Sequence, residues 1–222
     1  MSRHRSGRDP MANAQVRAVV ATSHWTCLGF RLGMLSLIRT ADEHTVVGHL
    51  GPDLLGSDWD AALALGNLRA HPDLPIGQAL LDQRLLAGIG TMYAAETLFL
   101  RQTHPWRPVS AIEDDDLEAL VETARRLLTI GATQVIQSTT GSTRRGEEVY
   151  VHARSGLPCR RCGDAVRVAP IGDPARERTM FSCPTCQGGL APGDDGRAQR
   201  PLGSGRGSRR GSGSRPGSLG LR

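Results

Sequence analysis

Apolar residues recur at helical spacing through the middle of the chain. In the clearest case they are three or one positions apart, at Leu117, Leu120, Val121, Ala124, Leu127 and Leu128. Residues at this spacing share one face of an α-helix, so the pattern predicts an amphipathic helix. Ser110 and Glu113 have the spacing of a capping box at its start, and Gly131 indicates its end. Three aspartates, residues 114–116, fall in the first turn, where the helix dipole favours anions, and we interpret them as a cap rather than a metal site.

Two further helices are predicted on either side of a glycine turn. One covers residues 75–86, and the next begins with Thr91 as its cap. Between them lie Gly88, Ile89 and Gly90. A glycine turn that leads into a helix leaves backbone N–H groups pointing outward, which suits the binding of a phosphate. The same motif also commonly ends a helix without binding anything, so both interpretations stay open at this point.

The N-terminal segment has the pattern of β-strands. Residues 16–21 and 34–38 are β-like runs separated by glycines, and they could pair as a hairpin or as part of a small sheet. Because two or three strands without a second layer are marginally stable, we expect this segment to belong to something larger. A Gly-Pro turn follows, and then a short helix is predicted over residues 59–65, with Asp58 as its N-cap and Gly66 at its end.

Four cysteines form two Cys-x-x-Cys pairs separated by twenty residues: Cys159, Cys162, Cys183 and Cys186. Two such pairs at this separation strongly favour a structural zinc site, in which four thiolates close a tetrahedral shell around one ion. The intervening residues suit a β-hairpin, with strands over 165–169 and 179–182 around a turn at 170–174. Two disulfides or a redox pair are the weaker alternatives, because the former belong to secreted chains and the latter would not need to be duplicated.

Composition adds a preference for nucleic acid. The chain has 222 residues and a formal net charge of +5, and all 27 cationic side chains are arginines. Arginine matches phosphate oxygens and stacks on bases, so nucleic acid is the first partner to consider. A GC-rich genome that replaces lysine throughout would explain part of the same bias.

The ends of the chain differ from its centre. Residues 1–12 are polar and rich in arginine, and residues 190–222 consist largely of Gly, Ser, Pro and Arg, so we expect both to be disordered. No apolar run is long enough to span a membrane, and the first residues lack the apolar core of a signal peptide. We therefore expect a bacterial cytoplasmic protein, associated with the nucleoid and monomeric.

Three stretches together carry a family resemblance. They are residues 51–55 (GPDLL), residues 80–93 (LLDQRLLAGIGTMY) with Glu96, and the ribbon residues 154–159 (RSGLPC) and 178–187 (RTMFSCPTCQ). In this order they resemble the formamidopyrimidine-DNA glycosylase / endonuclease VIII family, in particular its actinobacterial endonuclease VIII branch. The resemblance covers roughly residues 14–190. Glu96 could orient the glycine turn or be solvated.

The resemblance implies an α+β fold and a partner. Residues 13–56 would be the remnant of an N-terminal β-sandwich, 57–148 a helix-two-turn-helix domain that clamps DNA phosphates, and 149–189 a zinc-finger hairpin. The expected ligand is double-stranded DNA that contains oxidised bases or abasic sites. Its expected contacts are Gly88, Ile89, Gly90, Thr91, Arg154 and Arg178, with one structural Zn²⁺ on the four cysteines.

The family's reaction is excision of an oxidised base followed by cleavage of the abasic strand. It uses an N-terminal proline, an adjacent glutamate and a lysine, acting on a flipped-out nucleotide. This sequence begins Met1-Ser2-Arg3 and contains no lysine, and Thr91 stands where the family usually has asparagine. The catalytic residues are therefore unassigned, and two hypotheses follow. The chain is a DNA glycosylase and abasic-site lyase whose start is truncated or misannotated, or it is a catalytically inactive, zinc-dependent DNA-binding fragment. A generic zinc ribbon that contacts RNA or protein would leave residues 80–96 unexplained.

Overall fold

The computed structural model describes residues 13–201 of the chain. The chain divides into two compact units, Met1–Gly48 and His49–Arg222. The disorder expected for residues 1–12 and for 202–222 lies outside the described residues. Among the described helices, none combines the length and the apolar character needed to cross a lipid bilayer.

The first unit is a β-hairpin followed by two short helical turns. Strands β1 (Val16–Ala21) and β2 (Thr26–Phe30) are antiparallel, and η2 (Thr40–Asp42) and α1 (His44–Val47) come after them. The strand predicted over residues 34–38 was wrong, because β1 pairs instead with the segment next to it in sequence. The hydroxyl of Thr22 accepts a hydrogen bond from the backbone N–H of Trp25 at 3.0 Å and closes that tight turn. Val16 is the one buried residue among the described residues of this unit, which thus has no core of its own.

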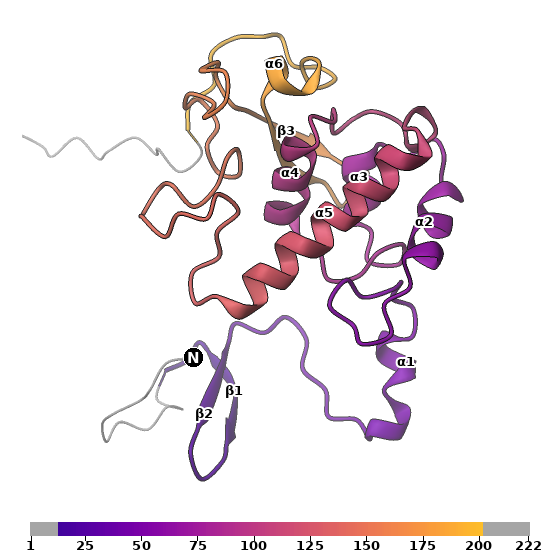
Figure 1. The fold of residues 1–222 in the computed structure, drawn as a ribbon. Coiled ribbons are helices and arrows are strands. Elements are labelled where there is room, and N and C mark those ends of the chain that lie inside the picture. Colours follow the sequence, from indigo (N-terminus) through magenta and orange to yellow (C-terminus); the bar gives the residue numbers. More distant parts are fainter. Residues whose placement is uncertain (1–12, 202–222) are drawn as a thin grey trace, which may run out of the picture. The chain divides into compact units, whose positions relative to one another are not determined.

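The second unit is built around a single buried helix, α4 (Thr91–Leu100). Seven consecutive residues of α4, from Tyr93 to Phe99, are buried. The helix packs against α3 (Ile76–Leu81), α5 (Asp114–Thr133) and a strand of the C-terminal hairpin. Helix α2 (Ala61–Arg69) and η3 (Val109–Ala111) complete the helical part, and Figure 1 shows α5 running past α4 and α2.

The helices predicted from periodicity all exist, but their ends differ from the predictions. Helix α2 is capped by Asp60 rather than Asp58, because the Asp60 carboxylate accepts the N–H of Leu63 at 2.9 Å. It also continues through Gly66, which lies inside the helix. Helix α3 ends at Leu81, five residues before the predicted end at 86, since the backbone of Asp82 is extended.

The long helix α5 begins and ends differently from its prediction. Glu113 occupies the N-cap without a side-chain hydrogen bond, and Ser110 lies in η3, so the predicted capping box was wrong. The helix also runs beyond Gly131 to Thr133. A Cβ at Gly131 would lie 1.9 Å from the hydroxyl oxygen of Tyr93. This glycine therefore permits α4 and α5 to pack closely and does not terminate the helix.

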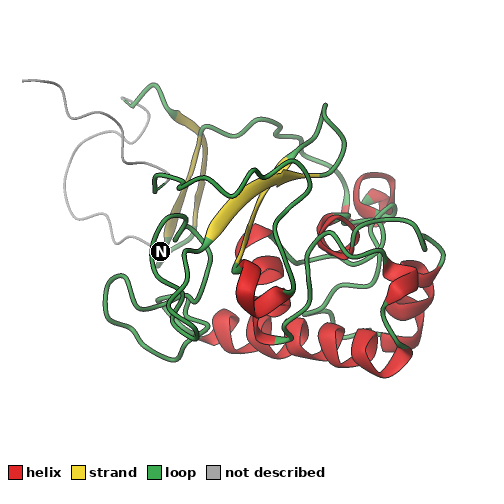
Figure 2. Ribbon diagram, turned by 90° about the horizontal axis from the view of Figure 1, so that it is seen from above, coloured by secondary structure: helices red, strands yellow, loops and turns green. Residues whose placement is uncertain are grey.

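The predicted hairpin is present in the C-terminal part of the second unit. Strands β3 (Arg167–Ile171) and β4 (Arg178–Ser182) are antiparallel, and the short helix α6 (Pro184–Gln187) follows; in Figure 2 strands are yellow and helices red. Met180 and Phe181 are buried in the same core cluster as α4 and α5. The helices and the hairpin, expected as separate domains, thus share one core.

Residues 190–201, which we call the strap, run beside β3. The Gln199 side chain accepts the N–H of Val168 at 2.8 Å and donates to its carbonyl oxygen at 3.0 Å, as a neighbouring strand would do. The guanidinium of Arg167 forms a bidentate salt bridge with the carboxylate of Asp194. A disordered tail was expected from residue 190 onward, but the described part of that tail makes specific contacts. Gln199 and Asp194 supply partners for polar groups at an otherwise open strand edge.

Candidate nucleic-acid interface and metal centre

The four predicted cysteine ligands come together at the base of the β3–β4 hairpin. Their sulfur atoms all lie within 4.8 Å of one another. The Sγ–Sγ distance is 3.9 Å between Cys159 and Cys186 and 3.4 Å between Cys162 and Cys183. Four thiolates around a tetrahedral Zn²⁺ lie about 3.8 Å apart, whereas a disulfide requires about 2.05 Å. The donor set and its spacing therefore fit one zinc ion and do not fit two disulfides.

Backbone and amide hydrogen bonds hold the two cysteine turns in place. In the first turn, the N–H of Gly163 donates to the carbonyl of Cys159 at 3.0 Å. In the second, the N–H of Cys183 donates to the side-chain oxygen of Gln187 at 2.9 Å. The amide nitrogen of Gln187 donates in turn to the carbonyl of Thr103 just after α4. The buried Gln187 thus attaches the cysteine cluster to the end of the central helix.

Two of the thiols, Cys183 and Cys186, are in surroundings that disfavour negative charge unless a cation is present. Burial raises the pKa of Cys183, and it raises the pKa of Cys186 to about 11. Burial also opposes ionisation of Cys159, but hydrogen bonds from the N–H groups of Cys162 and Arg161 outweigh it and lower that pKa. A divalent ion would stabilise all four thiolates together.

The glycine turn between α3 and α4 is held by the side chain of Gln83. Its oxygen accepts the N–H of Gly88 at 3.0 Å, and its nitrogen donates to the carbonyl of Ile89 at 2.9 Å. Gly88 has a φ of 94°, a conformation that strongly favours glycine. Ile89 is buried in the core, while Gly88 and Gly90 are exposed on either side of it. The turn is thus pinned by Ile89 and open to ligands along its backbone.

The start of α4 offers unpaired N–H groups beside this turn. Gly90 occupies the N-cap and Thr91 is the first helical residue, so Thr91 is not the cap that was predicted. No side chain caps the helix. The first N–H groups of an α-helix have no acceptor within the helix, and they carry the positive end of its dipole. The geometry therefore suits an anion, as the sequence suggested.

The segment at 51–55 braces the turn from behind. The N–H of Leu54 donates to the carbonyl of Ala87 at 3.2 Å, and the N–H of Ala87 donates to the carbonyl of Pro52 at 2.9 Å. Gly51 lies so close that an added Cβ would be 2.7 Å from the carbonyl of Leu85. This packing explains why a Gly-Pro segment far from the turn in sequence belongs to the same motif.

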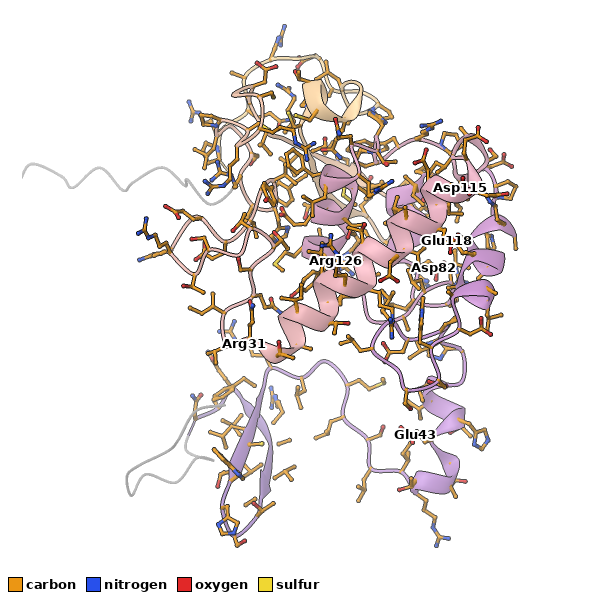
Figure 3. The ribbon with its side chains drawn as sticks, in the orientation of Figure 1. Arg31, Glu43, Asp82, Asp115, Glu118 and Arg126 are labelled. Carbon is orange, nitrogen blue, oxygen red and sulfur yellow. The ribbon has the colours of Figure 1, made fainter. Side chains whose placement is uncertain are left out.

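A cleft of about 400 Å³ lies between the segment that ends α3 and the tip of the β3–β4 hairpin. Its lining includes Gln83, Arg84, Arg176 and Arg178. Arg84 is held by the carboxylate of Asp82 at 2.6 Å, and this guanidinium lowers the pKa of Asp82; Figure 3 labels Asp82. Arg176 and Arg178 are exposed and outnumber Asp173 on the hairpin side of the cleft, which therefore presents net positive charge.

Glu96, on α4, is a site residue whose position the sequence did not reveal. Its carboxylate is fully buried. It accepts the backbone N–H groups of Tyr150 and Val151 at 2.8 Å and of His152 at 2.9 Å, and also the hydroxyl of Thr139. Glu96 is therefore neither solvated nor bound to the glycine turn, the two possibilities raised from the sequence. It fixes the polar loop between α5 and the cysteine cluster.

Arg154 lies in the segment that leads into the first cysteine turn. It is half-buried, and its Nη2 donates to the carbonyl of Pro158 at 2.8 Å. Burial lowers its pKa. The described structure thus uses Arg154 to hold the chain near the cysteine cluster, and the predicted contact with DNA would come from the exposed part of its side chain.

The acidic residues at the start of α5 pair with arginines. Asp114 binds Arg69 at 2.5 Å and Asp116 lies 3.5 Å from Arg101. Asp115 is exposed near the start of the helix, as Figure 3 shows. In residues 13–201, the cysteine cluster is the one group found that could hold a metal ion. The interpretation of the aspartates as helix-start residues agrees with their place in the first turn of α5.

Comparisons with known proteins identify the family. Residues 50–143 match the model of the formamidopyrimidine-DNA glycosylase H2TH domain. A probable endonuclease 8 2 of Streptomyces coelicolor is 48% identical over 183 residues, which are 82% of this chain and 66% of that protein. The DNA-(apurinic or apyrimidinic site) lyase Nei2 of Mycolicibacterium smegmatis is 38% identical over 82% of this chain and 70% of its own length. The chain belongs to the formamidopyrimidine-DNA glycosylase / endonuclease VIII family.

A solved structure agrees with this assignment. The complex of the Lactococcus lactis formamidopyrimidine-DNA glycosylase with abasic-site DNA superposes with a TM-score of 0.55 at 26% identity, over 68% of this chain and 57% of that one. The chain therefore has the mixed helix and strand fold of the family, with its helix-two-turn-helix domain and cysteine cluster. It spans about two thirds of the length of the curated relatives described above.

Two residues of the family site escaped prediction, although each left a signal in the sequence. Glu96 is the one charged residue in α4, a helix that is otherwise apolar or small on every side, and such a charge must find partners inside the protein. Gln83 is an uncharged polar residue near the end of the helix predicted over residues 75–86. Neither signal identifies the hydrogen-bond partners, because the partners lie five to 56 residues away along the sequence.

Proposed function

We propose that this chain binds damaged double-stranded DNA and acts in base-excision repair as a DNA glycosylase and abasic-site lyase. The observation that carries the proposal is the cleft lined by Gln83 and Arg178. On one side of it Gln83 holds an exposed glycine turn at the start of α4, and on the other Arg178 extends from the hairpin. A sugar-phosphate backbone is the ligand whose charge suits both sides.

Each predicted contact has a role in this proposal. The N–H groups of Gly88, Gly90 and Thr91 bind phosphate oxygens, and Ile89 anchors the turn in the core. Arg178 reaches the backbone near the damaged nucleotide, and Arg154 supports the loop that leads into the first cysteine turn. One Zn²⁺ on Cys159, Cys162, Cys183 and Cys186 keeps the hairpin that carries Arg178 rigid.

The first unit fits the same proposal as part of a β-sandwich. Its large apolar side chains are exposed, among them Val20 at 66%, Met34 at 80% and Leu37 at 101% relative exposure. Such residues stabilise a fold only when a second layer covers them. We propose that residues 13–48 contribute strands to such a sandwich. Residues 49–56, expected to belong with them, are part of the second unit, where Leu54 is buried in the core.

Binding and chemistry are tested on the same duplex, which contains an abasic site. Arg178→Ala should weaken binding about tenfold and reduce the dependence of log Kd on log salt by about one unit, as expected for one lost phosphate contact. Arg126→Ala is the matched control, because this exposed arginine on α5 does not line the cleft (Figure 3). Equal effects of the two substitutions would show that only general positive charge matters.

Trapping with borohydride tests the reaction. A covalent protein–DNA adduct would show that an amine of the protein forms an imine with the abasic sugar. Stoichiometric, salt-sensitive binding without an adduct would instead support the inactive DNA-binding fragment and contradict the lyase activity for this chain.

A further inference from the structure

Gln83 places three polar groups on the glycine turn and on the segment that braces it. Its backbone carbonyl accepts the N–H of Gly51 at 2.9 Å. Its side chain accepts from Gly88 and donates to Ile89, as described above. The residue lies directly after Asp82, the end of α3 labelled in Figure 3. A planar amide that holds both a donor and an acceptor of one turn fixes the direction in which the chain enters α4.

Only an amide of this length satisfies both contacts. A carboxylate accepts hydrogen bonds but cannot donate to the carbonyl of Ile89, and an apolar side chain can do neither. Gln83 also lines the cleft with Arg178. The residue therefore lies where the two sides of the proposed interface meet.

Gly90 leaves the exposed backbone of the turn without a side chain. Its φ is −114° and its ψ is 179°, which any residue can adopt. A Cβ built on Gly90 has no heavy atom within 4 Å. Unlike Gly88, whose φ of 94° requires glycine, Gly90 has no reason within the described structure to be glycine. The space it leaves open is available to a ligand that approaches the backbone closely.

We propose that Gln83 is a positioning residue of the DNA interface, whose amide holds the Gly88–Gly90 turn in the shape that admits a phosphate against Gly90. The inference rests on the proposed function, since it assigns the turn to the same sugar-phosphate ligand. Gln83 acts through the turn, and the phosphate contacts come from backbone N–H groups.

The test measures binding of the full chain to a duplex with a tetrahydrofuran abasic-site analogue, by fluorescence anisotropy at several salt concentrations. Gln83→Met should weaken binding about tenfold, since two hydrogen bonds that order the turn are lost. It should also lower the salt slope by about one unit, and amide hydrogen exchange should lose protection at Gly88. A purely structural role would change the melting temperature without changing the salt slope.

Gln83→Glu and Gln78→Glu form a charge-matched pair. Gln78 lines the same cleft, so both substitutions place one carboxylate there, but only the first removes the donor to Ile89. Gln83→Glu should therefore bind several-fold more weakly than Gln78→Glu. Equal binding by the two variants would overturn the positioning role.

Gly90→Ala separates this inference from the proposed function. The structure has room for the methyl group, so the melting temperature should not change, whereas binding should fall at least tenfold because the methyl group occupies the phosphate's place. If Gly90→Ala and Arg178→Ala weaken binding but Gln83→Met does not, the positioning role fails and the interface stands. If all three variants bind like the original chain, the interface itself is wrong.

Discussion

The helical part of the second unit (residues 49–133) and its hairpin part (residues 147–201) are stabilised by different interactions. The helical part is an apolar core, with side chains such as Leu54, Leu68, Leu80, Leu98 and Leu120 fully buried. The hairpin part buries fewer large apolar side chains. It depends on four cysteines, on the carboxylate of Glu96 and on the pairing of Arg167 with Asp194. The stabilisation that apolar burial contributes does not depend on a metal ion and varies little at moderate pH. The stabilisation that charged groups and thiolates contribute depends on the pH, and for thiolates also on a bound metal ion.

The same contrast separates the two sides of the proposed interface. The glycine turn belongs to the helical part and is pinned by the buried Ile89 and a neutral amide. Arg178 belongs to the hairpin part, which carries the cysteine cluster and whose position should depend on a metal ion bound there. The turn should therefore keep its shape under conditions that displace the arginine.

Removal of the metal should have the largest effect. The binding free energy of a structural zinc site is on the order of 10 kcal/mol, and it is available only to the folded hairpin. A chelator, or Cys183→Ser, should disorder residues 147–201 while most helical signal in circular dichroism remains. NMR would follow the two parts separately, and metal analysis should return one zinc per chain. Absence of zinc from the purified protein, or helices that melt together with the hairpin, would contradict the comparison.

Substitution of Glu96 should have the second-largest effect on stability. Glu96→Gln replaces one buried acceptor oxygen with an N–H donor that faces backbone donors, which should lower the free energy of unfolding by about 3 kcal/mol. Glu118→Gln, on the exposed face of α5 (Figure 3), makes the same chemical change and should stay within about 0.5 kcal/mol. Urea unfolding measures both variants. Similar values for the two would mean that the buried carboxylate does not hold the loop.

A substitution in the strap should have the smallest effect on the free energy of unfolding, and this effect should depend most clearly on pH. The guanidinium of Arg167 lowers the pKa of Asp194 below its usual value near 3.8. The carboxylate therefore stabilises the folded state above about pH 4, and this contribution is lost as the pH falls through the lowered pKa. Asp194→Asn should remove about 1–2 kcal/mol at pH 7, and this loss should become smaller as the pH falls below about 4.

Asp195→Asn is the control for the strap. Asp195 is 59% exposed and its partner Arg197 is 88% exposed, so this pair should contribute little at any pH. A stability difference for Asp194→Asn that did not vary with pH would show that the strap contributes through packing alone.

The predicted elements show which features are local. The spacing of Leu117 to Leu128 predicted α5, and the paired cysteines predicted both the metal centre and a hairpin between them. These features depend on neighbours three, four or a few residues away, so a short window of sequence contains them. Helix ends were predicted less well, because Gly66 and Gly131 look like stop signals but lie inside helices. Gly131 is a close-packing position, whereas a Cβ at Gly66 would meet no heavy atom within 4 Å.

What the sequence by itself determined about this protein is the apolar face of each helix, the four thiol ligands and the backbone chemistry of the Gly88–Gly90 turn. Only the tertiary structure decided that Glu96 would receive the N–H groups of residues 150–152 and that the strap would cover β3. Those partners are brought together by burial of a shared core, and the free energy that selects them comes from satisfying polar groups once water has been excluded. The sequence shows which residues carry polar groups. Only the folded chain shows which hydrogen-bond partner each buried polar group has.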